Sequence, residues 1–263
     1  MTYVFSGGDV SAVAERTSIY ALRLGDDALI SAQRMGEWIA AAPELEEDVA
    51  LGNIALDLLG QARSLLSYAG ELEGAGRDEN ALAYFRNERD FCNAQIFELG
   101  NGDFGTTMAK LLVTSTYHLA LYERLQSSTD AMLAAIAGKA VKEVDYHRDH
   151  ATQWVLRLGD GTDESHRRMQ RGLETVWPYV GELFESDDVV GGLAAEGVAV
   201  DPAELEAPAL SYLSDVLSTA TLDQPELPAG RPTGGRHGIH TEQLGYLLAE
   251  MQHIARSHPG ARW

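Results

Sequence analysis

The sequence of 263 residues contains a single cysteine and no long hydrophobic run. Cys92 cannot form a disulfide within the chain, and no Cys/His spacing resembles a zinc site. Beside Phe91, in a helical pattern with no neighbouring base, Cys92 is expected to be a small core residue rather than a nucleophile. No apolar run approaches the roughly 20 residues that cross a bilayer, and residues 1–13 lack the pattern of a signal peptide. These absences predict a cytoplasmic protein with no membrane contact.

Basic residues are also scarce, because 20 Lys and Arg stand against 40 Asp and Glu, for a formal net charge of -20. An acidic surface repels polyanions, which argues against nucleic acid and anionic membranes as partners. With 45% hydrophobic and 23% charged residues, the chain can bury a core and is not disordered. The charge leaves room for a protein partner, for which we expect an apolar contact face with arginine–carboxylate pairs.

Strand patterns are nearly absent, so the fold is predicted to be all α. Apolar residues at helical spacing, with turn and capping signals between them, predict eight helical runs: 18–42, 44–74, 78–98, 104–126, 129–158, 162–183 with a kink at Pro178, 201–220 and 241–257. Residues 186–200 are glycine-rich and irregular, with room for a short helix, and residues 223–240 hold three prolines and four glycines that predict an extended connection. We expect one domain, 1–263, forming an up-and-down bundle of long helices with additional C-terminal helices.

Several polar residues fall on the apolar stripes of these helices, where an uncompensated carboxylate would be costly. They are Asp26, Gln33, Glu37, Asn53, Asp57, Gln61, His118, Glu143, His147 and His150. A di-iron carboxylate bundle needs a Glu from each of two helices and a Glu-x-x-His pair from each of the other two. Here no imidazole stands three residues after Asp57 or after Glu143, although His147, four residues from Glu143, still shares its face.

The positions Glu37, Asp57, Glu143 and His147 are therefore interpreted as a degenerate di-iron site. In this interpretation a network of carboxylate, amide and imidazole groups replaces the metal, and the chain carries no catalytic residue and no cofactor. The alternative is that these four residues still bind iron and that the chain is itself a di-iron oxygenase.

A local basic spot, Arg231, Arg236, His237 and His240, lies among glycines in the extended connection. Glycine amides and cations together could hold a phosphate. The alternative that we favour is an arm packed across a partner subunit, because the glycines lack the strand and helix that flank a phosphate loop. No Ser/His/Asp arrangement or dinucleotide-binding turn is found in a βα context.

Six stretches of sequence, spread over the chain, are similar to one known family. They are residues 24–30 (LGDDALI), 53–63 (NIALDLLGQAR), 142–147 (KEVDYH), 157–162 (RLGDGT), 164–169 (ESHRRM) and 241–252 (TEQLGYLLAEMQ). In these motifs the sequence resembles the C subunits of bacterial ring-1,2-phenylacetyl-CoA epoxidases, over about the whole chain.

The resemblance implies a ferritin-like helical subunit of a multicomponent oxygenase in phenylacetate degradation. In that family the A subunit holds the di-iron centre, a reductase subunit with FAD and iron–sulfur groups supplies electrons from NADPH, and the C subunit is a structural partner. The resemblance thus implies the A subunit and other subunits of the complex as partners. For the isolated chain, a homodimer and a monomer are both left open. It also raises the hypothesis that Arg231 and Arg236 touch the coenzyme A phosphates of a substrate bound next door. A third hypothesis is a ferritin-like binding or storage protein with no partner.

Overall fold

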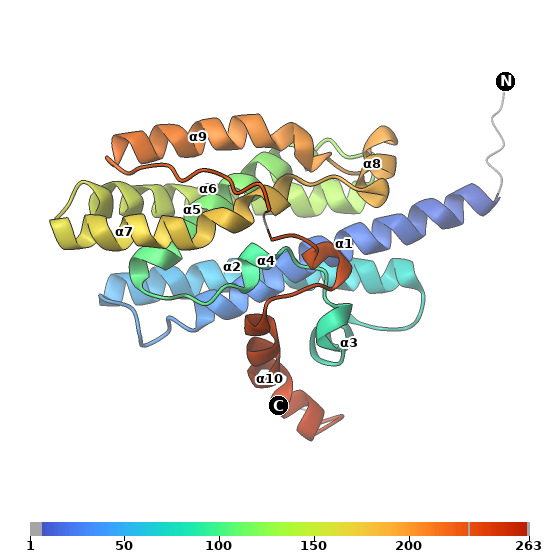
Figure 1. The fold of residues 1–263 in the computed structure, drawn as a ribbon. Helices are drawn as coiled ribbons and strands as arrows, with labels where there is room; N and C mark the ends of the chain where they lie inside the picture. The colour runs from blue at the N-terminus through green and yellow to red at the C-terminus, as the bar shows by residue number, and fades with distance from the viewer. Residues whose placement is uncertain (1–6, 231, 262–263) are drawn as a thin grey trace.

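The computed structural model describes residues 7–230 and 232–261, which form helices and connections with no strand (Figure 1). Four long helices build the bundle: α1 (Gly7–Gly36), α2 (Leu45–Glu73), α5 (Phe104–Leu125) and α6 (Ala131–Gly159). Helix α1 packs along α2, α5 packs along α6, and α2 meets α6. The prediction of an all-α, ferritin-like bundle is confirmed. None of the helices in the described ranges is both long and apolar enough to span a membrane.

The helix ends lie where the sequence supplies caps. Asp103 accepts a hydrogen bond from Thr106 N at the start of α5, and Asp130 accepts from Leu133 N at the start of α6. Gly74, with φ 70°, closes α2 in a left-handed conformation. These local signals explain why the predicted bounds of α2, α5 and α6 agree with the structure to within a few residues.

The helices between α6 and the connection 223–240 cover the bundle. They are α7 (Asp163–Val176), the 3-10 helix η2 (Trp177–Phe184), α8 (Asp188–Ala195), η3 (Pro202–Leu205) and α9 (Glu206–Thr219). At Pro178 the chain tightens into η2 instead of kinking an α-helix, because proline has no N–H to donate. The described residues of the connection 223–240 are extended as expected, apart from η4 (Gly235–His237). The connection leads to α10 (Glu242–Ser257), which projects away from the long helices (Figure 1).

The first helix differs from its predicted bounds of 18–42. In the structure α1 ends at Gly36, and residues 37–41 form a turn in which Ala40 adopts a positive φ of 64°. The Asp48 carboxylate accepts a hydrogen bond from Ala40 N at 2.5 Å, which holds this turn. The helix therefore ends before Pro43, and a side chain of the next helix holds the turn that follows it.

The prediction of one helix over 78–98 is wrong. The segment contains α3 (Glu79–Tyr84), the short 3-10 helix η1 (Glu88–Asp90) and α4 (Gln95–Glu98), with extended residues between them. In the extended part the backbone amides donate to side chains of other elements: Cys92 N to Asp26 at 2.8 Å, and Ala94 N to Asp27 at 3.0 Å. These buried carboxylates replace the carbonyl acceptors that a continuous helix would have supplied.

Candidate functional site

Two polar contacts join α2 to α6 midway along these helices, a place that we call the bundle centre. Asp57 Oδ2 lies 3.1 Å from His147 Nε2, and Gln61 Nε2 donates to Glu143 Oε2 at 3.0 Å. Each helix contributes two residues one turn apart, so the contacts form two successive rungs. The structure thus brings together three of the four residues predicted for the degenerate metal site, with an amide as the fourth group.

Burial determines the protonation state of His147 in the first rung. It lowers the pKa of His147, and the opposing attraction of Asp57 does not restore it. A neutral imidazole donating Nε2–H to the carboxylate therefore accounts for the first rung, because a carboxylate can only accept. On the same face of α6, His150 Nε2 lies 3.0 Å from Glu47 on α2.

Glu37 lies apart from the rungs, in the turn that follows α1. Its carboxylate accepts hydrogen bonds from Arg34 at 2.6 Å and from Asn101 at 2.9 Å. His118 is packed as an aromatic ring, stacked 5.1 Å from Phe97, and burial lowers its pKa to about 3, so the ring is neutral. The Glu37 carboxylate, which was predicted as part of the degenerate di-iron site, is hydrogen-bonded to Arg34 and Asn101 instead.

A buried lysine lines the same small cavity as His147. Lys110 on α5 lines a cavity of about 20 Å³ together with Leu58, His118 and His147, which leaves room for about one water molecule. Burial lowers the pKa of Lys110 to about 7, and its Nζ donates to Leu99 O at 2.5 Å. The donors do not fit a di-iron centre, which needs two Glu-x-x-His pairs. In the described ranges no three His, Cys, Asp or Glu side chains are grouped as ligands of a metal ion.

Two adjacent, fully buried aspartates on α1 form a second polar cluster. Arg86 donates to both oxygens of Asp26, with one of the two contacts at 2.9 Å, and Arg236 donates to both oxygens of Asp27 at 2.8 Å. Burial raises the pKa of Asp27 to about 6, although Arg236 favours the ionised form. The two arginines come from segments far apart in the sequence, so each pair ties a connection to α1.

Two further buried carboxylates bind the same connections. Glu182 in η2 accepts from Gln95 N at 2.6 Å and from Gly235 N at 2.7 Å. Glu98 in α4 accepts from Asn93 Nδ2 at 3.0 Å and contacts His240 Nδ1 at 2.9 Å. Burial works to lower the pKa of His240, but its contact with Glu98 outweighs this effect and the pKa is raised. We call Asp26, Asp27, Glu98 and Glu182 the carboxylate cluster.

The carboxylate cluster corrects the interpretation of the basic spot. Arg236 and His240 are internal partners of Asp27 and Glu98, and Arg236 Nη1 also donates to Cys92 O at 3.0 Å. This part of the connection packs on its own chain, and the favoured alternative, an arm across a partner subunit, stays a prediction. Arg231 lies outside the described residues.

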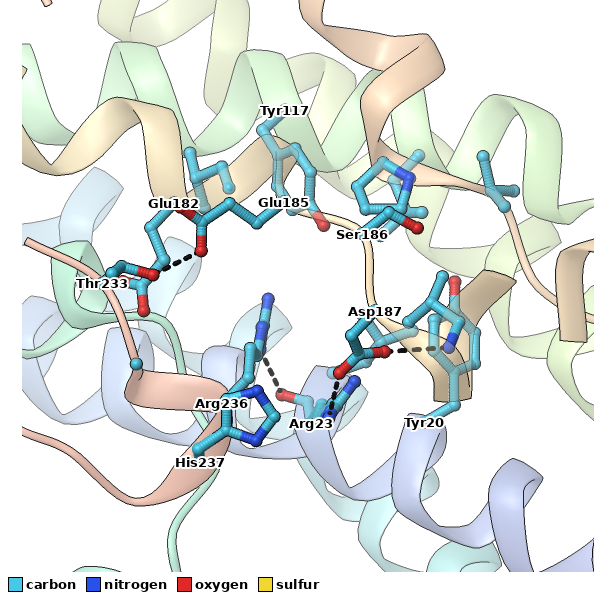
Figure 2. A pocket seen from close by; sticks show the side chains of 17 residues that line it. Tyr20, Arg23, Tyr117, Glu182, Glu185, Ser186, Asp187, Thr233, Arg236 and His237 are labelled. Atoms are coloured by element: carbon cyan, nitrogen blue, oxygen red, sulfur yellow. Dashed lines mark hydrogen bonds and ion pairs between the residues drawn. The ribbon is translucent and has the colours of Figure 1, made fainter. Parts of the chain in front are cut away.

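The nearest cavity to Arg236 is small and already lined by paired charges (Figure 2). It measures about 70 Å³, whereas pockets for drug-sized ligands span about 300–1,000 Å³. Arg23 donates to Asp187 at 2.6 Å on one side of it, and Thr233 contacts Glu185 on the other. Arg236 therefore has neither a free charge nor the space to bind a coenzyme A phosphate in the structure described.

Sequence reasoning missed Asp27, Glu98, Glu182 and Lys110. A signal was present for two of them, because Glu98 and Glu182 each interrupt a strongly apolar run, Ile96–Leu99 and Val180–Phe184. Cys92 is only partly buried, not a full core residue. Burial raises its pKa to about 11, so the protonated thiol is not a nucleophile at neutral pH, as expected.

Comparison with known proteins agrees with the resemblance seen in the motifs. The family model described as "Phenylacetic acid catabolic protein" matches residues 10–263. The chain is 48% identical over 244 residues to the C subunit of the 1,2-phenylacetyl-CoA epoxidase of Escherichia coli K12, covering 93% of this chain and 98% of that protein. Both rungs of the bundle centre and the whole carboxylate cluster fall within the matched range. The chain therefore belongs to the phenylacetic acid catabolic protein family.

Proposed function

We propose that this chain is a structural, non-catalytic subunit of a phenylacetyl-CoA epoxidase complex in aerobic phenylacetate degradation. Its likeness to the C subunit of such an enzyme, over nearly the full length of both proteins, supports membership of a complex of this kind. In this proposal the di-iron centre belongs to the catalytic A subunit, and the flavin, iron–sulfur and NADPH chemistry belongs to the reductase subunit.

The observation that carries the non-catalytic role is the state of the bundle centre. Asp57 and Glu143 each have a partner within the chain, His147 and Gln61. The polar interior of this chain thus joins helices to one another. A rigid bundle of this kind can brace the helices of a catalytic neighbour that hold metal ligands.

The proposal is tested by measuring phenylacetyl-CoA-dependent NADPH oxidation by the purified cognate complex. Leaving this chain out is expected to lower the rate at least tenfold. A complex that contains the double variant Asp57→Asn, His147→Gln is expected to keep more than half of the rate, because an amide pair can replace this rung without touching a reaction centre. If that variant folds and assembles but the rate is lost, the result favours the alternative, in which this chain is itself a di-iron oxygenase.

A further inference from the structure

Helix α2 is apolar on two opposite faces. One face is buried in the core and includes Leu51, Ile54, Leu58 and Leu65. The opposite face exposes a second series of apolar side chains: Leu45 at 75%, Val49 at 55%, Leu56 at 66% and Leu59 at 42%. A helix that packs on a single core needs only one apolar face, so the second one is unexplained by the fold of this chain.

The spacing of the exposed series is that of a helix-packing seam. With Gly52 included, its members, Leu45, Val49, Gly52, Leu56 and Leu59, follow one another at alternating steps of four and three residues. This is the 3.5-residue repeat that lets one helix pack its side chains between those of another. The seam extends over 15 residues, from Leu45 to Leu59, or about 21 Å of helix at 1.5 Å for each step between residues. We call these five residues the outer stripe.

The outer stripe borders a groove of about 470 Å³ between α2 and the end of α1. Ala32, Gly36 and Ile39 line the α1 side. A Cβ atom added at Gly36 or at Gly52 would meet no atom within 4 Å, so both glycines face open space. Small residues at the floor and leucines along one wall allow the backbone of a docked helix to approach closely.

The turn after α1 keeps one more apolar side chain at the edge of this groove. Ile39 is 61% exposed, and it precedes Ala40, whose positive φ is unfavourable for a residue with a Cβ atom. The hydrogen bond from Ala40 N to Asp48 maintains this conformation. The protein therefore keeps a strained turn that exposes Ile39 at the edge of the groove. We interpret this exposed isoleucine as a contact for a partner that covers it.

The charges around the groove select the kind of occupant. Asp48 lines the groove, the exposed Glu44 and Glu46 precede it at the start of α2, and the first basic residue of α2 is Arg63, beyond the outer stripe. We call Glu44, Glu46 and Asp48 the acidic rim. A second copy of this chain would bring an equally acidic rim against this one, and like charges disfavour that pairing. A helix with lysines or arginines beside its apolar face would complement the rim.

We propose that the groove between α1 and α2 binds an amphipathic helix of another subunit of the complex, apolar toward the outer stripe and basic toward the acidic rim. The inference rests on the proposed function and adds the contact surface to it. A standard interface buries about 800 Å² on each partner, so this helix is one part of a larger contact.

The test measures the affinity of the full-length chain for the other subunits of its own complex by calorimetry, with light scattering to give the mass of the assembly. The variant Leu56→Glu places a charge in the centre of the outer stripe and is expected to weaken binding at least 100-fold. Met132→Glu is the matched control, because Met132 is 46% exposed in the first turn of α6, outside the groove. It should change the affinity less than threefold. Glu46→Lys should weaken binding several-fold, and less at high salt.

The outcomes separate this inference from the proposed function. The three exposed-site variants should unfold at the temperature of the wild-type chain, which shows that folding is unaffected. If the wild-type chain binds none of the other subunits, the proposed function itself fails. If the wild-type chain binds and Leu56→Glu binds equally well, only the groove is wrong. A Leu56→Glu variant that dissociates a homodimer but still binds the other subunits would show that the occupant is a second copy, and would also overturn the inference.

Discussion

Replacing Arg86 with methionine is expected to lower the free energy of unfolding by about 3–5 kcal/mol, because it leaves Asp26 ionised and buried without its partner. Arg86 donates to both oxygens of Asp26, and its guanidinium lies 4.1 Å from the centre of the Phe91 ring. Neither side chain is more than 3% exposed, so water cannot replace the lost contacts. The hydrogen bond from Cys92 N to Asp26 would remain, but a neutral amide does not compensate a buried charge. Urea unfolding followed by circular dichroism measures the change.

Arg63→Met is the matched control for Arg86→Met. The Arg63 side chain is 75% exposed and lies 3.2 Å from Glu79, so its loss should cost less than about 1 kcal/mol. A second variant, Asp26→Leu with Arg86→Met, removes both charges and should recover much of the stability. Equal effects of Arg86→Met and Arg63→Met would mean that Asp26 does not depend on its buried partner.

Replacing Arg236 with methionine is expected to cost about 3 kcal/mol at pH 8 and much less at pH 5. Burial already raises the pKa of Asp27 to about 6, and the loss of Arg236 would raise it further. The unfolded chain has an ordinary aspartate pKa near 3.9, so the folded variant holds a proton that the unfolded chain has released. The free energy of unfolding of the variant therefore falls as the pH rises from about 3.9 to the raised pKa of Asp27 in the folded chain. Unfolding measured at several pH values gives the slope.

The variant that also carries Asp27→Asn isolates the cause of this slope. Without an ionisable group at position 27, the pH dependence that Arg236→Met introduces should disappear, and most of the stability at pH 8 should return. Arg124→Met is a suitable exposed control, since the Arg124 side chain is 45% exposed beside Glu204. A cost of Arg236→Met that is the same at pH 5 and pH 8 would show that lost packing, not an unpaired aspartate, is responsible.

The long helices could be predicted from the sequence because their signals are local. Asp103, Asp130 and Thr162 precede apolar periodic runs, and each one caps a helix in the structure. Residues 78–98 could not be predicted in this way. Their helical periodicity is overridden by Asp26 and Asp27, which are more than 60 residues away in the sequence and accept hydrogen bonds from Cys92 N and Ala94 N. No local pattern contains that information.

The inward polar residues were only partly predictable for a related reason. Helical spacing placed Asp57, Gln61, Glu143 and His147 on facing sides, and the structure joins them in two rungs. The helical spacing of a residue predicts the face on which it lies, but not the side chain on another element with which it pairs. The sequence therefore placed Arg236 in a basic spot for a phosphate or a partner subunit, although it lies against Asp27 on α1. The net charge of -20 conceals this, because some of the 40 acids are internal counterions.

The most direct test of the central claim is the iron content of this chain, purified from cells supplied with iron and measured by mass spectrometry together with an absorption spectrum. The three carboxylates are hydrogen-bonded within the chain: Asp57 to His147, Glu143 to Gln61 and Glu37 to Arg34. We therefore expect far less than one iron per chain, both for the chain alone and for the chain separated from the assembled complex. Two irons per chain, with the absorption of an oxygen-bridged pair, would contradict a structural role and identify this chain as a metal-binding subunit.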